Sequence, residues 1–147
     1  MIRRRATTRR GLLAAGAAAM ASIGGAAWAG QVDVGEPPPG KGQIVFFRRW
    51  YWGGGANTYM VREGEREIGR LPNSNYFIAA VDPGWHTFTV KAEKHVDMQI
   101  EIEAGETYYV LCELGTGWIL YQPMLTPTEQ RVFDEISAKL TLSTPVG

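Results

Sequence analysis

Apolar and polar residues alternate along much of the chain after residue 42, and this pattern predicts β-strands. The clearest case is 96–103, where Val, Met, Ile and Ile alternate with Asp, Gln, Glu and Glu. Side chains of a strand point to opposite faces in turn, so one face of this strand is expected to be buried and the other solvated. By contrast, Ile44-Val45-Phe46-Phe47 is apolar at every position, which predicts a strand buried on both faces.

Glycine and proline mark the turns between the predicted strands. Glu63-Gly64-Glu65 separates two strands and indicates a hairpin. Asp82-Pro83-Gly84-Trp85 is typical of a type II turn, because Pro presets φ at the second position and Gly accepts a positive φ at the third. Seven or eight short strands at this spacing favour an antiparallel β-sandwich. The predicted strands are 44–47, 57–62, 66–71, 76–81, 86–92, 96–102, 107–114 and 118–122.

One helix is predicted near the C-terminus, from about residue 127 to 139. Thr126 is the expected N-cap, and Pro127 suits the first helical position because its missing N–H needs no partner there. An apolar stripe at helical spacing is expected to seal one edge or end of the sandwich. The stripe consists of Val132, Phe133, Ile136 and Leu140. The predicted fold class is therefore an all-β antiparallel sandwich over residues 43–147 with one C-terminal helix.

The first 29 residues have the composition of an export signal. A cluster of arginines precedes an Ala- and Gly-rich stretch, and Ala27 and Ala29 form the small-residue pattern at which signal peptidase cuts. Arg9 and Arg10, followed shortly by apolar residues, resemble the twin-arginine export motif. We therefore expect the twin-arginine export machinery and signal peptidase as partners, and periplasmic residence with no membrane span after cleavage. The alternatives are an ordinary secretory signal and an uncleaved membrane anchor.

The formal net charge of zero is the sum of two parts with opposite signs. Residues 1–29 contain 5 of the 15 basic residues and none of the 15 acidic ones, so the remainder carries 10 basic and 15 acidic residues, a charge of −5. An acidic domain argues against nucleic-acid binding, which depends on contacts with phosphates. The Pro- and Gly-rich stretch 30–42 between the two parts is expected to be an extended linker. Its simplest role is a tether, and the alternative is a ligand for a proline-reading domain.

Residues able to carry out catalysis are few. The single Cys112 excludes an intramolecular disulfide, and its place on an apolar strand face predicts a buried thiol with a raised pKa and no nucleophilic role. We expect His86 to point inward and to bond a backbone carbonyl near the Pro-Gly turn. A metal site would need both His86 and His95 with an acid such as Asp97. We therefore expect no catalytic residue, no bound metal and no cofactor.

The most unusual segment follows the first predicted strand and reads Arg48-Arg49-Trp50-Tyr51-Trp52-Gly53. Because successive side chains of an extended chain alternate in direction, the three aromatic rings cannot all point inward. Exposed rings beside arginine can stack on a sugar or dock a protein partner. The candidate binding residues are Arg49, Trp50, Tyr51 and Trp52. The alternative is a loop that folds back so that its rings pack locally, with Trp118 and Tyr121 either joining the patch or completing the core.

Four phrases, in the same order along the chain, resemble the bacterial domain-of-unknown-function family 2846. The resemblance implies a small exported protein with an immunoglobulin-like or prealbumin-like sandwich, and it implies no activity or ligand. Many members resemble lipoproteins, but this chain has no Cys near the predicted cleavage site, which favours soluble periplasmic residence. The phrases lie at 39–48, 67–77, 81–88 and 104–110.

These observations lead to one expected function and two alternatives. The expectation is a non-enzymatic binding or structural module of the cell envelope, which contacts an unknown envelope protein or glycan. The first alternative is a module that binds cell-wall polysaccharide or peptidoglycan through the same aromatic rings. The second is a metal-dependent periplasmic enzyme that uses the two histidines.

Overall fold

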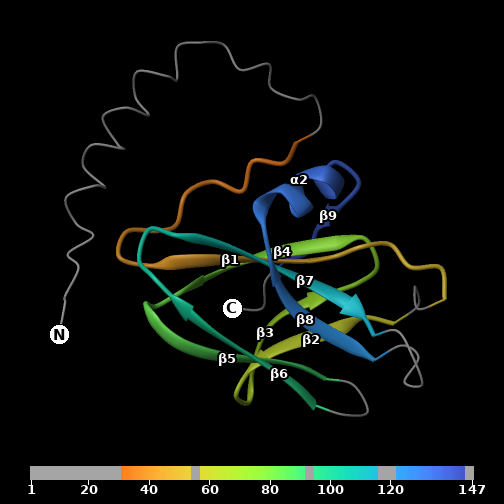
Figure 1. The fold of residues 1–147 in the computed structure, drawn as a ribbon, viewed down its shortest axis with the longest axis horizontal. Coiled ribbons are helices and arrows are strands. Elements are labelled where there is room, and N and C mark those ends of the chain that lie inside the picture. The colour runs from red at the N-terminus through yellow and green to blue at the C-terminus, as the bar shows by residue number, and fades with distance from the viewer. Residues whose placement is uncertain (1–30, 54–56, 92–94, 116–121, 145–147) are drawn as a thin grey trace, which may run out of the picture.

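The computed structural model of the chain describes residues 31–53, 57–91, 95–115 and 122–144. Nine strands and one helix lie within these ranges (Figure 1). In chain order they are β1 (Gly42–Arg48), β2 (Tyr59–Glu63), β3 (Arg66–Leu71), β4 (Asn75–Val81), β5 (Gly84–Lys91), β6 (His95–Ile102), β7 (Thr107–Leu114), β8 (Pro123–Thr128), α2 (Gln130–Ser137) and β9 (Thr141–Leu142).

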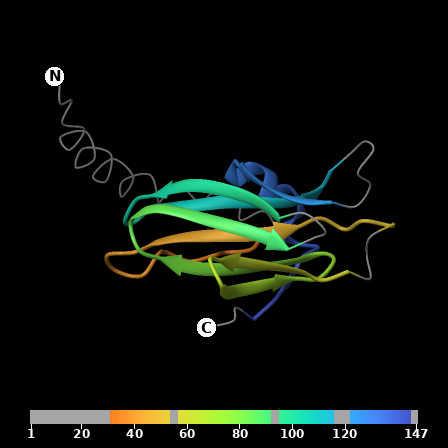
Figure 2. The same cartoon turned by 90° about the horizontal axis from the view of Figure 1, so that it is seen from below.

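The strands form two sheets packed face to face, so the predicted all-β sandwich is confirmed. One sheet has the order β8-β7-β1-β4-β9 and the other the order β3-β2-β5-β6. Figure 1 shows α2 outside the five-stranded sheet, and Figure 2 views the molecule from the side of the four-stranded sheet. Most neighbours are antiparallel, but β1 pairs with β7, and β4 with β9, in parallel. These parallel pairs join strands distant in sequence, which the local strand pattern does not reveal.

The core between the sheets is aromatic at its centre. The ring of Phe46 lies 5.1 Å from that of Phe77 and 5.3 Å from that of Phe88. Val45 and Phe47 point to the other side of β1 and are also fully buried, because α2 covers that face. The prediction that this strand is buried on both faces is confirmed. The predicted position of the helix is wrong, since its apolar stripe covers the outer face of a sheet rather than an edge or end of the sandwich.

The predicted hairpin turn is present, whereas the predicted type II turn is a bend at Pro83 with Gly84 already in β5. Gly64 has φ +61 in the hairpin between β2 and β3. Gly84 has φ +127 after Pro83, but the strands on either side belong to different sheets, so this bend carries the chain across the sandwich. The hairpin also contains a bulge next to Val61. A bulge changes the alternation of side chains.

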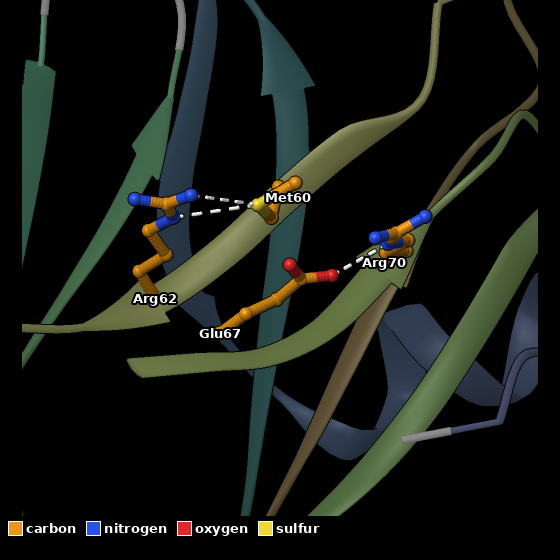
Figure 3. Close-up of polar contacts among 4 residues, drawn as sticks. All are labelled: Met60, Arg62, Glu67 and Arg70. Carbon is orange, nitrogen blue, oxygen red and sulfur yellow. Dashed lines mark hydrogen bonds and ion pairs between the residues drawn. The ribbon is translucent and has the colours of Figure 1, made fainter. Parts of the chain in front are cut away.

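The bulge allows two residues of β3 that are three positions apart to meet on the outer face of the four-stranded sheet (Figure 3). There the Arg70 guanidinium pairs with the Glu67 carboxylate. On the neighbouring β2, the Arg62 guanidinium nitrogens lie 3.3 Å from the sulfur of Met60. The outer face of this sheet, which α2 does not cover, is therefore polar here, as expected for a solvated sheet face.

The C-terminal part differs from the prediction in two respects. The expected strand 118–122 lies almost entirely outside the described residues, and the strand that follows is β8. The helix begins at Gln130 with Glu129 as its N-cap residue, three positions after the predicted start at Pro127. Pro127 instead belongs to β8, which lies at the edge of its sheet. An edge strand tolerates proline, because one side of it needs no N–H donor.

The stretch expected to be a tether packs against the sandwich instead. Val32 and Val34 contact the cluster formed by α2 and the outer face of the five-stranded sheet. The prolines end in a turn in which the Lys41 N–H donates to the Pro38 carbonyl at 3.0 Å, with Gly40 at φ +75. We call residues 31–41 the N-terminal segment. Tertiary contacts, which composition does not encode, hold it on the domain.

The predicted signal peptide, with Arg9, Arg10, Ala27 and Ala29, lies outside the described residues. Within the part of the chain that the structure describes, no helix is long and apolar enough to cross a membrane.

Candidate functional site

The aromatic segment follows β1 at one end of the sandwich, and its rings divide between solvent and protein. Trp50 is 59% exposed and Trp52 88%, with ring centroids 5.7 Å apart and ring planes tilted by 58°. Arg49 is also exposed, whereas Tyr51 between the two tryptophans is half-buried. This is the alternation expected from an extended chain. We call Trp50 and Trp52 the tryptophan pair.

Tyr51 anchors the loop that carries the tryptophan pair. Its backbone N–H donates to Oδ1 of Asn73 at 2.9 Å, and Nδ2 of Asn73 donates to the Tyr51 carbonyl at 3.1 Å. Burial raises the pKa of the Tyr51 hydroxyl, and a hydrogen bond with the backbone of Leu114 opposes part of this rise. The loop is thus fixed to the β3–β4 turn and to the end of β7, so the two exposed rings have a defined place.

Arg48 is a buried cation, whereas its neighbour Arg49 is exposed, and residue type alone does not distinguish the two. Its side chain is fully buried, and its guanidinium lies 4.3 Å from the centre of the Tyr59 ring. One terminal nitrogen donates to the Leu71 carbonyl at 3.0 Å and to the Asn57 carbonyl. Arg48 therefore connects β1 to the opposite sheet and to the base of the loop with the tryptophan pair. The alternation of side chains along β1 does indicate that Arg48 points inward, because it continues the inward-facing series of Ile44 and Phe46.

Another exposed tryptophan lies at the other end of the sandwich. Trp85 is 71% exposed and is the second residue of β5, whose first residue, Gly84, pairs with Ile102. This end also contains the start of β1, since Gly42 pairs with Val81 just before the turn. Trp85 is therefore separated from the tryptophan pair by the length of the sandwich. Trp118 and Tyr121, which were candidates for the same patch, lie outside the described residues.

His86 has the structural role expected from the sequence. One ring nitrogen lies 2.7 Å from the Asp82 carbonyl oxygen of the Pro-Gly turn, and the other contacts the Glu63 carboxylate. The ring stacks on Phe88 with centroids 5.8 Å apart. His95 is exposed and pairs with Lys91 at the opposite end of β5 and β6, so the structure does not bring the two histidines together. Within the described ranges, no group of three or more His, Cys, Asp or Glu side chains could hold a metal ion.

The contact between His86 and Glu63 should make stability depend on pH. Desolvation lowers the pKa of His86, but the hydrogen bonds and charges of Glu63 and Asp82 outweigh it and raise the pKa above 6.5. A pKa raised in the folded state stabilises the fold fully below the unfolded value and less as pH rises through the folded value. We therefore expect the free energy of unfolding to fall as pH rises above about 6.5.

Urea denaturation between pH 5.5 and 8.5 measures this dependence. The H86Q variant should lose the fall in stability over that range, whereas H95Q, which removes the other imidazole, should keep it. An identical pH profile in H86Q and the unsubstituted chain would show that the contact between His86 and Glu63 does not contribute.

Cys112 is buried on the inner face of β7, as the strand pattern predicts. Its side chain is 1% exposed, and burial raises the pKa of the thiol to about 12. A thiol with so high a pKa forms almost no thiolate at neutral pH, which removes its nucleophilic character. Cys112 belongs to the core together with Val110 and Leu125.

A family model described as "Protein of unknown function (DUF2846)" matches residues 38–122. The matched stretch runs from the turn before β1 to the residue before β8, and it includes the aromatic segment but neither α2 nor β9. No curated protein matches the chain.

Proposed function

The chain belongs to the DUF2846 family of proteins of unknown function, and from this membership and its surface we propose that it is a non-enzymatic binding module of the cell envelope. Export rests on the sequence of residues 1–29, with Arg9 and Arg10 read by the twin-arginine machinery and cleavage after Ala29. In this proposal the mature protein resides in the periplasm and binds an envelope component through the tryptophan pair and Arg49.

The exposure of the tryptophan pair on an anchored loop is the observation that carries this proposal. Adjacent exposed apolar rings mark interaction surfaces more often than single ones do, and Trp and Arg are among the residues enriched in binding hot spots. Asn73 and Tyr51 hold the loop in place before any partner arrives. A preformed surface loses less conformational entropy on binding than a loop that must become ordered.

A glycan is the second candidate partner, and the geometry of the rings favours it specifically. The tryptophan planes are tilted by 58° rather than stacked, so part of each ring remains available to a flat ligand. A sugar ring presents a flat apolar C–H face that suits such a ring, and the guanidinium of Arg49 can donate hydrogen bonds to sugar hydroxyls.

A photo-crosslinking experiment tests the proposal and identifies a protein partner. A photoreactive amino acid replaces the exposed Gly53, which keeps both tryptophans and Arg49, and crosslinked partners are identified by mass spectrometry in intact cells. Binding to the identified partner is then measured with purified proteins. Hot-spot tryptophans contribute at least about 2 kcal/mol, so W50A/W52A should weaken binding by about 30-fold or more.

The matched control is W85A, which removes an exposed tryptophan at the opposite end and should leave binding unchanged. A photoreactive residue at the exposed Thr87 controls for nonspecific capture. If W50A/W52A and W85A weaken the interaction equally, the tryptophan pair is not the contact surface. For the glycan candidate, sedimentation with purified cell-wall sacculi should fall in W50A/W52A and not in W85A. No sedimentation of the unsubstituted protein would exclude that candidate.

A further inference from the structure

A cleft of about 440 Å³ lies on the outer face of the five-stranded sheet, far from the tryptophan pair. Its walls are the N-terminal segment, the start of β7 and the start of α2, which lie beside one another in Figure 1. Thr107 pairs with Gln43 near the beginning of β1, whereas the tryptophan pair follows the end of that strand. The cleft is lined by Gln31, Val32, Asp33, Val34, Gly35, Thr107, Tyr109 and Gln130.

Specific hydrogen bonds hold the walls of the cleft in place. The backbone N–H of Val32 donates to the Ser137 hydroxyl of α2 at 3.2 Å. The buried amide of Gln43 donates to the Gly35 carbonyl at 2.9 Å and to the Thr107 hydroxyl at 3.0 Å. A buried glutamine on a central strand costs free energy unless its amide is satisfied. Here both of its partners are residues that line the cleft, so the wall is attached to the sheet.

Tyr109 places a polar group in the cleft that has no protein partner. Its side chain is 6% exposed, and its ring packs 5.5 Å from that of Phe133 under the helix. Among the described residues no hydrogen bond with its hydroxyl is present. The hydroxyl is also not one of the buried side-chain atoms that lack a partner, so it is open to the cleft, where a ligand or water can complete its bonding. The hydroxyl can accept a hydrogen bond as well as donate one.

The charge of the cleft is negative. Burial raises the pKa of Tyr109, and the negative charges of Asp134 and Asp33 raise it further. The Asp33 carboxylate is oriented by the Gly35 N–H, which donates to Oδ1 at 2.9 Å and leaves Oδ2 available. No lysine or arginine lies among the described residues that line the cleft. The negative electrostatic potential of the cleft favours the binding of a cation and disfavours that of an anion.

We propose that this cleft binds a small organic cation that carries an ammonium group. The ammonium donates one hydrogen bond to Oδ2 of Asp33 and one to the hydroxyl oxygen of Tyr109, and Val32 and Val34 contact the carbon chain of the ligand. The amides of Gln31 and Gln130 at the rim provide polar contacts for substituents. This site is independent of the tryptophan pair and adds a second ligand to the function proposed above.

Titration of the ¹⁵N-labelled full chain with simple probes, followed by NMR, tests the proposal. The probes are ethylammonium and 1,4-diaminobutane as cations, acetate as an anion and ethanol as a neutral analogue. We expect saturable shifts of the amides of Asp33, Tyr109 and Gln130 with the two amines only. Charge-assisted hydrogen bonds are about twice as strong as neutral ones, so D33N should weaken binding by about tenfold or more and Y109F by about threefold.

The matched control is E101Q, which removes an exposed carboxylate from the other sheet and should leave amine binding unchanged. W50A/W52A should also leave it unchanged, which separates this proposal from the function of the tryptophan pair. Three results would overturn the proposal. They are the absence of saturable shifts at tens of millimolar amine, equal binding of acetate or ethanol, and an equal loss of affinity in D33N and E101Q.

Discussion

Replacement of Arg48 by methionine is expected to lower the free energy of unfolding by about 2–5 kcal/mol. Methionine retains much of the apolar stem, so the loss comes from the polar end of the side chain. Without the guanidinium, the carbonyls of Leu71 and Asn57 lose their hydrogen-bond donor in the core. An unsatisfied buried acceptor costs about 1–3 kcal/mol, and the contact with the Tyr59 ring is lost as well.

Urea denaturation followed by circular dichroism measures this loss, and R49M is the matched control. Arg49 is the next residue and is exposed, so R49M should change stability by less than about 0.5 kcal/mol. The R48K variant keeps the charge but has one nitrogen in place of the guanidinium fork. Its free energy of unfolding should lie between that of R48M and that of the unsubstituted chain. Equal losses in R48M and R49M would contradict the role assigned to the buried guanidinium.

The R48M substitution should also affect the tryptophan pair, because Arg48 holds the base of the loop that carries the two rings. Asn57 lies at the end of this loop, and its carbonyl accepts a hydrogen bond from the guanidinium. Loss of this bond should loosen the loop even where the sandwich remains folded. The buried cation therefore links the stability of the core to the order of the candidate binding surface.

The strands and turns of this fold could be predicted from the sequence because their signals are local. The alternation in β6 and the unbroken apolar run in β1 each state how many faces of a strand are buried. The bend at Pro83 and Gly84 could be recognised from two residues, since each restricts φ in a known way. The pairing of the strands could not be predicted from the sequence. β1 lies between β4 and β7, and only tertiary packing selects these neighbours.

The errors arose where tertiary context outweighs a local preference. Pro127 is a good first helical residue in isolation, yet pairing with β7 places it in an edge strand. The proline-rich composition of the N-terminal segment indicates a tether, yet Gln43 and Ser137 fix it to the domain. Both partners are polar residues with no local pattern, and their role becomes visible only in the packed structure.

The candidate site shows the same limit. Alternation required that the aromatic rings at 50–52 divide between two directions, and they do. Which rings face solvent depends on Asn73, which lies on a different turn and captures the backbone of Tyr51. The cleft at Tyr109 had no signal at all in the sequence, because its walls come from three distant parts of the chain.

Phe133 connects the helix to the sandwich more than any other side chain of α2. It is fully buried, and its ring lies within 5.2–5.5 Å of the rings of Phe47, Tyr76 and Tyr109. The other members of the apolar stripe are only partly buried. Because α2 also holds Val32 through Ser137, loss of this anchor should affect both the helix and the N-terminal segment beside it.

The F133A variant is therefore expected to lower the free energy of unfolding by about 3–5 kcal/mol, the cost of removing a buried phenyl ring. F133L keeps most of the volume and should cost about 1.5 kcal/mol or less. L142A, at an exposed apolar side chain of β9, is the control for a loss of apolar surface without a cavity. Hydrogen exchange should show faster exchange at residues 31–35 in F133A and not in L142A. Unchanged exchange there, despite the loss of stability, would mean that the N-terminal segment is held by Gln43 without help from the helix.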